Sequence, residues 1–272
     1  MRENIVFTVW WVILSVLAEI GDRVLIHHNP MYYIVSNQGE MALKAFEFIM
    51  VVLTPIFVFV VLFLLFTLVR FHTHRGEMPP ANRRFAIDNK AFVVIWVGGS
   101  IVVNLLFFLH PTTSAMEQMF ALDEPAHNRQ DLVVNVTARQ WEWIFSYPQY
   151  HLTQTVNANG QDMLELPVNQ PVKFVLRSYD PYHTYDQYAD VIHSFWIPAF
   201  GIKEDVIPGE TRYEYLTPTQ ITSYAVNPMV RVQCAEVCGP GHPWMEAPLK
   251  VVSHAQFAKW IKYEQSLAGN GG

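Results

Sequence analysis

Two long apolar segments constrain the fold of this chain more than any other feature of its sequence. Residues 46–69 carry a single charge, Glu47, and residues 91–109 carry none. A helix needs about 20 apolar residues to cross a hydrocarbon core of roughly 30 Å. Charged residues make up only 15% of the chain, against about 25% in soluble proteins. Both segments therefore predict membrane-spanning helices, which is a better interpretation than buried helices of a soluble protein.

The segment between these two predicted helices indicates their orientation. Residues 70–90 contain five Arg and Lys residues against Glu77 and Asp88. Short loops rich in Lys and Arg stay on the cytoplasmic side of a membrane. Residues 46–110 are therefore expected to form a multi-pass transmembrane helical hairpin. Residues 111–272 would then follow on the extracytoplasmic side.

The N-terminal segment, residues 1–45, allows two interpretations. Its apolar run, residues 4–18, is short for a membrane span and follows Arg2. It is either an additional transmembrane helix or the apolar part of a signal peptide. The absence of a convincing small-residue cleavage motif before Glu19 favours a retained helix, but the sequence leaves both interpretations open.

The sequence after residue 130 changes to short β-prone segments separated by Pro, Gly and Asn. Such a pattern predicts an all-β sandwich or barrel. Residues 255–267 place apolar side chains on one face and predict a terminal helix. The clearest β-prone segments are residues 131–138, 171–178, 211–218, 221–226, 229–234 and 249–252.

The charge of the chain is unevenly spread. Residues 1–110 hold 8 Lys and Arg against 7 Asp and Glu, whereas residues 111–272 hold 10 against 17. An acidic outer domain attracts basic proteins and repels anionic surfaces, so no nucleic-acid partner is expected. Ordinary solvation of an acidic surface explains the same composition.

The two cysteines of the chain belong to a compact set of soft ligands. Cys234, Cys238, His242 and Met245 lie within one run, CAEVCGPGHPWM. The Gly-Pro-Gly between the second cysteine and the histidine forbids a regular helix, so these side chains are expected on a folded-back loop. His193, in the upstream run DVIHSFWIP, is a further candidate ligand from a neighbouring strand.

Several kinds of site compete for these residues. A disulfide between Cys234 and Cys238 would leave His242 and Met245 unexplained. A Cys2His2 zinc site fits the number of ligands, but a thioether favours copper. A mononuclear blue-copper site needs one cysteine, which leaves a second thiol over. Two thiolates that bridge two copper ions use every ligand, and their negative charges offset most of the charge of the metals.

At these residues the chain resembles subunit II of cytochrome c oxidase, in the haem-copper oxidase superfamily. The family motif C-x-E-x-C-G-x-x-H-x-x-M is complete over Cys234–Met245, and so is D-V-x-H-S-F-W-x-P over residues 190–198. The resemblance covers most of residues 45–265. It implies a membrane-anchored chain with a transmembrane helical hairpin and an all-β cupredoxin-like domain that holds a dinuclear CuA centre.

The resemblance also implies roles for particular residues. Glu236 would give its backbone carbonyl to one copper, while its carboxylate would help to bind a magnesium ion shared with subunit I. Trp141 would receive the electron, and Asp190 would orient the site; Trp141 and Trp143 could instead be ordinary core residues. The implied metal ligands are His193, Cys234, Glu236, Cys238, His242 and Met245.

The function implied by the resemblance is electron transfer within a larger enzyme. Electrons from a c-type cytochrome or a small copper protein would pass through the copper pair to haem in subunit I. Oxygen would be reduced to water there, with proton pumping, so the chain would be part of a proton-translocating oxidoreductase with other oxidase subunits as partners. A quinol oxidase subunit would lack the cysteines, a copper carrier would need no partner subunit, and nitrous oxide reductase would need a large histidine-rich domain.

The chain departs from the family pattern in four places. Glu142 stands where the family usually has Tyr, and Val232 stands where Gly is common. Residues 179–189 form an insert, either an innocuous surface loop or a change to the docking face. Some members carry a carboxylate at the mouth of a proton channel near the start of the second helix. This chain has no carboxylate near Val93 and Trp96, and Asp88 is the closest one. No proton-entry residue is therefore assigned.

Overall fold

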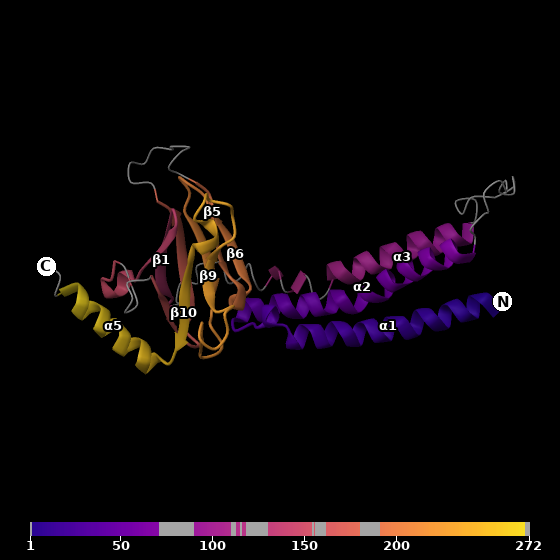
Figure 1. Ribbon diagram of the computed structural model, residues 1–272, viewed down its shortest axis with the longest axis horizontal. Coiled ribbons are helices and arrows are strands. Elements are labelled where there is room, and N and C mark those ends of the chain that lie inside the picture. The colour runs from indigo at the N-terminus through magenta and orange to yellow at the C-terminus, as the bar shows by residue number, and fades with distance from the viewer. Residues whose placement is uncertain are drawn as a thin grey trace. The chain divides into compact units, whose positions relative to one another are not determined.

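The chain divides into two compact units, and each has its own fold. The structure is a computed structural model (Figure 1). One unit comprises Met1–His28 and Lys44–Glu117, and the other comprises Asn29–Leu43 and Gln118–Gly272. The described residues are 2–70, 90–109, 113–114, 116–117, 130–153, 155, 162–179 and 191–269.

The first unit is helical. Its helices are α1 (Arg2–His28), α2 (Asn37–Arg70) from Lys44 onward, and α3 (Lys90–Leu109). Each contains a stretch long and apolar enough to cross a membrane. The N-terminal apolar run is thus part of a helix much longer than residues 4–18, and it provides a third candidate span. Asp88 lies outside the described residues.

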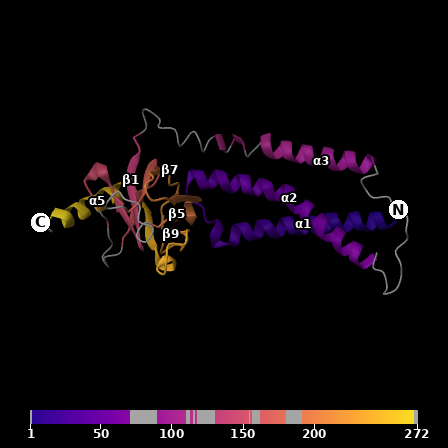
Figure 2. The same cartoon turned by 90° about the horizontal axis from the view of Figure 1, so that it is seen from above.

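Helices α1 and α2 run side by side (Figures 1 and 2). Phe7 of α1 packs its ring edge against Phe59 of α2, with centroids 5.7 Å apart. The indole Nε1 of Trp11 donates a 2.8 Å hydrogen bond to the carbonyl oxygen of Pro55. Hydrogen bonds between helices satisfy polar groups that would otherwise face hydrocarbon, so these contacts join α1 to the predicted hairpin.

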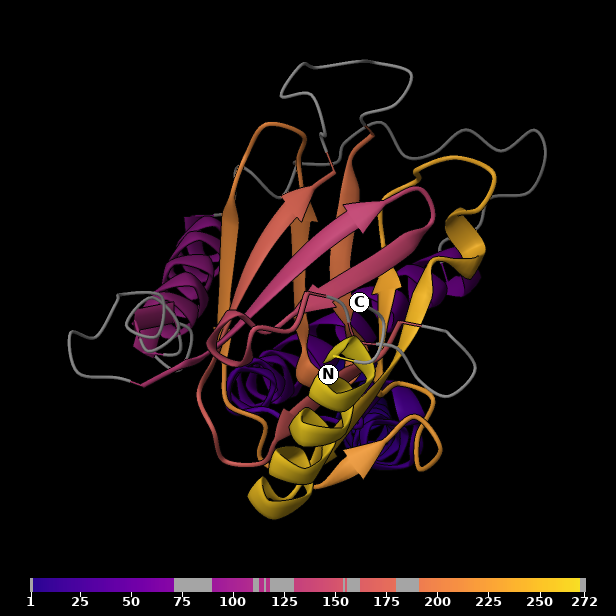
Figure 3. The ribbon, with the colours of Figure 1, turned by 90° about the vertical axis from the view of Figure 1, so that its left-hand side faces the viewer.

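The second unit is a β-sandwich, as Figure 3 shows. One sheet has the strand order β2-β1-β4-β7, and the other has the order β3-β10-β9-β5-β6, with β8 paired to β10. The first sheet comprises β1 (Leu132–Arg139), β2 (Glu142–Ser146), β4 (Val172–Ser178) and β7 (Arg212–Leu216). The second comprises β3 (Leu164–Pro167), β5 (His193–Ile197), β6 (Ile202–Val206), β8 (Thr222–Ser223), β9 (Arg231–Cys234) and β10 (Glu246–Val252).

The core of the sandwich follows from alternation along the strands. Strand β1 buries alternate side chains from Leu132 to Ala138, and β1 pairs parallel with β4 and antiparallel with β2. Successive side chains of a strand point to opposite faces, so one face of each sheet fills the core. Helix α5 (His254–Gly269) buries Phe257 and Ile261 against this domain. The domain is cupredoxin-like, as the family resemblance implied.

Residues 33–40, the joining segment, belong to the domain although they lead into α2. The Val35 amide donates to the Ala199 carbonyl at 2.8 Å, and the Ser36 hydroxyl donates to the Phe200 carbonyl at 2.6 Å. Val35 and Ser36 are fully buried. The start of α2 is therefore bonded into the sandwich next to the short helix η4 (Pro198–Phe200), which directly follows β5.

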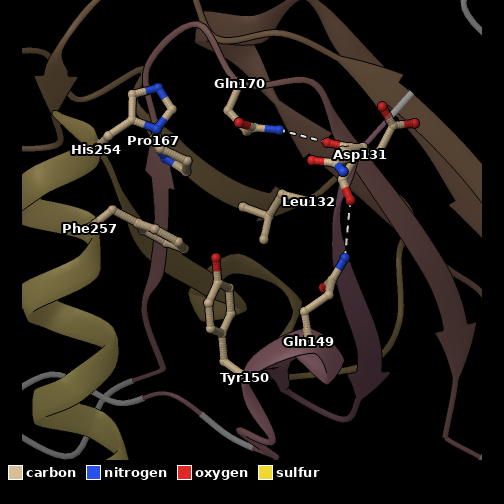
Figure 4. Close-up of a pocket in the computed structure, with 9 residues that line it drawn as sticks. Asp131, Leu132, Gln149, Tyr150, Pro167, Gln170, His254 and Phe257 are labelled. Carbon is tan, nitrogen blue, oxygen red and sulfur yellow. Dashed lines mark hydrogen bonds between the residues drawn. The ribbon is translucent and has the colours of Figure 1, made fainter. Parts of the chain in front are cut away.

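A cavity of about 480 Å³ opens between α5 and the start of β1 (Figure 4). His254, which follows β10 in the sequence, lines this cavity. The cavity therefore lies at the last residues of β10, whereas Met245 precedes the first residue of that strand. The Gln149 amide donates to the Asp131 carbonyl at 3.0 Å, and the Gln170 amide donates to the Gln130 carbonyl at 2.8 Å. These glutamines support the backbone at this end of the sandwich.

Candidate metal centre

Two strands of the second sheet provide the outer parts of the candidate site. His193 is the first residue of β5 and Cys234 is the last residue of β9. The strands pair antiparallel with Phe195 opposite Cys234, and the Ala235 amide donates to the Ser194 carbonyl at 3.0 Å. This pairing brings together a histidine and a cysteine that are far apart in the sequence.

The loop between β9 and β10 provides the remaining ligands. Gly239 has a φ of +115°, a conformation that side chains other than hydrogen strongly disfavour. The His242 amide donates to the Gly239 carbonyl at 3.0 Å, which folds the loop back. The Cys234 amide donates to the Met245 carbonyl at 3.0 Å and closes it. The glycine-rich spacing therefore produces the folded-back loop that the sequence predicted.

The side-chain donors form a continuous chain of close neighbours. The two sulfur atoms of Cys234 and Cys238 are 3.7 Å apart. His193 Nδ1 lies 3.8 Å from Cys234 Sγ, and His242 Nδ1 lies 3.6 Å from Cys238 Sγ. Met245 Sδ is 3.8 Å from Cys238 Sγ, and the Glu236 carbonyl oxygen is 3.2 Å from Cys234 Sγ. The arrangement is nearly symmetric about the sulfur pair.

These distances fit metal ligation and exclude a disulfide in this conformation. A disulfide has a sulfur–sulfur distance of about 2.05 Å, against 3.7 Å here. Two sulfurs about 2.3 Å from one tetrahedral metal lie roughly 3.8 Å apart. The donor atoms of His193, Cys234 and Cys238 all lie within 4.8 Å of one another. Thiolates, imidazoles and a thioether are the ligands that copper prefers.

Burial favours the neutral forms of two candidate ligands, His193 and Cys238, when no metal is bound. His193 is only 1% exposed. Burial, helped by the nearby His242, lowers the pKa of His193 to about 4, so its imidazole nitrogen is free to bind a metal near neutral pH. Burial, together with the neighbouring Cys234, raises the pKa of Cys238 to about 12. A metal must therefore displace the thiol proton on binding, which makes affinity depend on pH.

Trp141 lies against the ligand loop. Its indole Nε1 donates a 3.0 Å hydrogen bond to the Cys238 carbonyl, and 41% of the side chain is exposed. A Cβ atom on Gly241 would lie only 2.3 Å from Trp141 Cδ2. The indole can contact the loop because position 241 has no side chain. The role of Trp141 in electron entry stays a prediction.

Trp143 occupies the core beneath the same loop. It is fully buried, and its indole Nε1 donates to the Met245 carbonyl at 3.2 Å. Its ring packs edge-on against His193, with centroids 6.2 Å apart. Trp143 is thus a core residue that also supports two of the candidate ligands.

Gln140 was not among the residues singled out from the sequence. Its Nε2 donates a 2.7 Å hydrogen bond to the Cys238 carbonyl, the same oxygen that accepts from Trp141. Its position next to Trp141 in RQWEW was a weak signal, because glutamine in a turn between strands is normally solvated.

Two of the departures from the family pattern, Glu142 and Val232, have local explanations. Glu142 pairs with Arg139 at 3.3 Å on the exposed edge of β2. Val232 is fully buried and fills the core. Asp190 and residues 180–189 of the insert lie outside the described residues. Tyr179, which is described, stacks under Arg139 with the guanidinium carbon 5.2 Å from its ring centroid.

Comparisons with known proteins find the same family along the sequence of the β-domain. Residues 132–252 match the family model described as cytochrome C oxidase subunit II, periplasmic domain. Cytochrome c oxidase subunit 2 of Bacillus sp. (strain PS3) is 28% identical over 198 residues, which are 72% of this chain and 51% of that protein. The chain thus matches only about half the length of that relative.

Two further matches are also to subunit II of cytochrome oxidases. Probable cytochrome c oxidase subunit 2 of Rickettsia bellii is 25% identical over 243 residues, 84% of this chain and 81% of that protein. Among solved structures, the periplasmic domain of subunit II of cytochrome oxidase of Bradyrhizobium japonicum aligns with a TM-score of 0.40 and 26% identity. That alignment covers 50% of this chain and 94% of the other.

Proposed function

We propose that this chain, whose residues 132–252 match the cytochrome c oxidase subunit II family model, is the electron-accepting subunit of a terminal oxidase. Electrons enter from a c-type cytochrome or a small copper protein and leave for haem in subunit I, where oxygen is reduced to water with proton pumping. The helical unit anchors the chain in the plasma membrane of a prokaryote beside subunit I and other oxidase subunits. The β-domain lies on the extracytoplasmic side.

The observation that carries this proposal is the symmetric chain of donors. Its central sulfur pair is 3.7 Å apart, and an imidazole nitrogen lies within 4 Å of each sulfur. This arrangement offers one histidine and two shared sulfurs to each of two metal ions. A mononuclear blue-copper site would leave one of the two cysteine sulfurs unused, and a mononuclear Cys2His2 site would leave the Met245 thioether unused. When bound, a dinuclear copper centre would supply a one-electron carrier.

The chain's own residues have separate tasks in this proposal. Cys234 and Cys238 would be the thiolates that hold both metals, and His193 and His242 would each hold one. Met245 would supply a weak thioether ligand. Buried neighbours hold these side chains in place and exclude water, which limits rearrangement when the charge of the site changes.

Two residues connect the site with its partners. Trp141 provides the entry point for the electron, because it is partly exposed and bonds directly to the Cys238 carbonyl. Glu236 contributes its carbonyl oxygen, which lies 3.2 Å from Cys234 Sγ. Its side chain is exposed and is available for a magnesium ion shared with subunit I.

The decisive experiment combines metal analysis with EPR on the copper-loaded full-length protein. Two copper ions per chain, and a hyperfine pattern from two equivalent copper nuclei, are expected. Cys238→Ser should lose that pattern, because a single thiolate cannot form the bridged pair. A spectrum from one copper nucleus in the wild-type protein would contradict the proposal.

Purification separates this function from that of a membrane-anchored copper carrier. The oxidase subunit should purify with a haem-containing subunit and retain copper against a chelator. A carrier would be stable alone and would release its metal readily. A quinol oxidase subunit would need no copper, and the complete ligand set argues against it.

A further inference from the structure

Two side chains from the first sheet converge on one backbone oxygen of the ligand loop. Gln140 Nε2 donates to the Cys238 carbonyl at 2.7 Å, and Trp141 Nε1 donates to the same oxygen at 3.0 Å. A carbonyl oxygen has two lone pairs, so these two bonds use its full capacity. Cys238 is also the residue whose sulfur contacts Cys234, His242 and Met245.

The bonds connect parts of the domain that are otherwise separate. Gln140 and Trp141 form the turn between β1 and β2 in the first sheet. Cys238 lies in the loop between β9 and β10 of the second sheet. The turn therefore holds the ligand loop from across the end of the sandwich.

The packing around Gln140 is close. A Cβ atom on Gly239 would lie 3.1 Å from Gln140 Nε2, so the amide lies directly against the loop backbone. Gln140 is half-buried, whereas Trp141 is 41% exposed. The hydrogen bond from Gln140 is thus shorter than the one from Trp141, and Gln140 is the less exposed of the two residues.

We propose that Gln140 is a positioning residue for the copper centre, an inference that rests on the function proposed above. By fixing the Cys238 peptide, Gln140 sets the direction of the bond from Cα to Cβ and hence the orientation of the bridging sulfur. It also holds the loop against the indole of Trp141. Groups that orient metal ligands in this way tune the metal and are often needed for its binding.

The chain offers a matched control at the other end of the domain. Gln170 Nε2 donates to the Gln130 carbonyl at 2.8 Å, as Figure 4 shows. Gln140→Leu and Gln170→Leu each remove one amide donor of the same kind and keep a similar side-chain volume. Only the former removes a bond to the ligand loop.

The first measurement is hydrogen exchange of the metal-free full-length protein in detergent. The non-proline amides of residues 236–245 should exchange up to about tenfold faster in Gln140→Leu than in the wild type, because the loss of one hydrogen bond lowers the free energy of local opening. In Gln170→Leu the exchange of this loop should not change. Equal loop exchange in all three proteins would overturn the proposal.

The second measurement uses the copper-loaded protein. Gln140→Leu should keep the hyperfine pattern of two copper nuclei but shift the couplings of the cysteine β-protons, since these depend on the orientation of the thiolate. Gln140→His, whose ring can donate a hydrogen bond, should restore the wild-type couplings. Unchanged couplings in Gln140→Leu would overturn the proposal.

The two measurements separate this inference from the proposed function. A wild-type protein without the signal of two copper nuclei would contradict the dinuclear centre, while loop exchange in the metal-free protein would still test Gln140. A wild-type dinuclear signal with no effect of Gln140→Leu would leave the function standing and remove the role of Gln140.

Discussion

Gly241 is the residue on which the contact between Trp141 and the ligand loop depends. Its backbone lies in the right-handed helical region, with φ −84° and ψ −1°, so alanine is compatible with the backbone there. A Cβ atom, however, would lie 2.3 Å from Trp141 Cδ2 and 2.4 Å from Cγ. The effect of a side chain at this position is therefore steric and acts through the indole.

A double-mutant cycle tests this contact. Gly241→Ala should destabilise the domain by about 1–3 kcal/mol, the usual cost of overpacking. In the Trp141→Ala background the same substitution should cost almost nothing, because the obstructing indole is gone. Thermal unfolding of the four detergent-solubilised proteins, followed by near-ultraviolet circular dichroism, gives the coupling energy. Additive effects would show that the two residues do not press on each other.

At the scale of elements, the joining segment (residues 33–40) is the part of the structure that the apolar pattern did not reveal. Gly39 approaches the domain so closely that a Cβ atom would lie 2.7 Å from the Phe200 carbonyl oxygen and 2.6 Å from Ile34 Cγ2. The Asn37 side chain accepts a 2.7 Å hydrogen bond from the Thr217 amide. This polar first turn of α2 is therefore shaped by its contacts with the sandwich.

Gly39→Ala is expected to destabilise the domain, again by about 1–3 kcal/mol, because the new methyl group meets backbone that cannot move aside cheaply. Gly21→Ala is the matched control, since a Cβ atom on Gly21 of α1 would meet nothing within 4 Å. The measurement is the midpoint of thermal unfolding for each full-length variant. A shift no larger for Gly39 than for Gly21 would refute the close approach.

The sequence predicted the elements whose pattern is local and missed those defined by partners. Apolar runs identified α2 and α3, and β-prone segments identified β1, β4, β7 and β9. Strand β5 was expected only as the strand that carries His193, because the run DVIHSFWIP does not alternate apolar and polar residues. The first turn of α2 was missed because its Asn, Gln and Glu side chains carry no apolar pattern. For the site, ligand types and spacing were informative, but Gln140 required knowledge of which loops meet.

Helix α5 packs over a pair of buried carboxyl groups. Glu165 on β3 and Glu264 on α5 are 6% and 5% exposed. Burial raises the pKa of Glu165 to about 7; Lys250 opposes this shift and Glu264 adds to it. Burial also raises the pKa of Glu264. The Tyr147 hydroxyl, which donates to the Glu165 carbonyl at 2.8 Å, fixes the backbone beside this pair.

The raised pKa values make stability depend on pH in a defined direction. The ordinary pKa of 4.5 and the raised pKa of about 7 bound a pH interval. In this interval the folded domain keeps a proton on Glu165 that the unfolded chain has lost. The free energy of unfolding should therefore decrease as pH rises through this interval and level off above it. Denaturant titrations across the interval measure the slope, which Glu165→Gln should reduce. An undiminished slope in that variant would assign the effect to other groups.

At the scale of the whole molecule, the charge is divided between the two parts of the chain. Residues 1–110 are close to neutral, whereas residues 111–272 hold 10 Lys and Arg against 17 Asp and Glu. A net negative domain increases the association rate of a basic partner, and salt screens that attraction. The Debye length falls from about 10 Å at 0.1 M ionic strength to about 3 Å at 1 M. The identity of the electron donor can therefore be probed through salt.

With a basic c-type cytochrome as donor, kcat/KM of the assembled oxidase should decrease steadily as ionic strength rises, because encounter is the step that charge accelerates. A cytochrome whose lysines have been acetylated should react more slowly at low salt and show a much flatter dependence. Electron transfer within the oxidase after rapid reduction should not change with salt, since it involves no encounter, and it serves as the internal control. If kcat/KM for the unmodified cytochrome proves insensitive to salt while internal transfer is intact, the donor docks through apolar contacts or a tether, and the acidic surface only keeps the domain solvated.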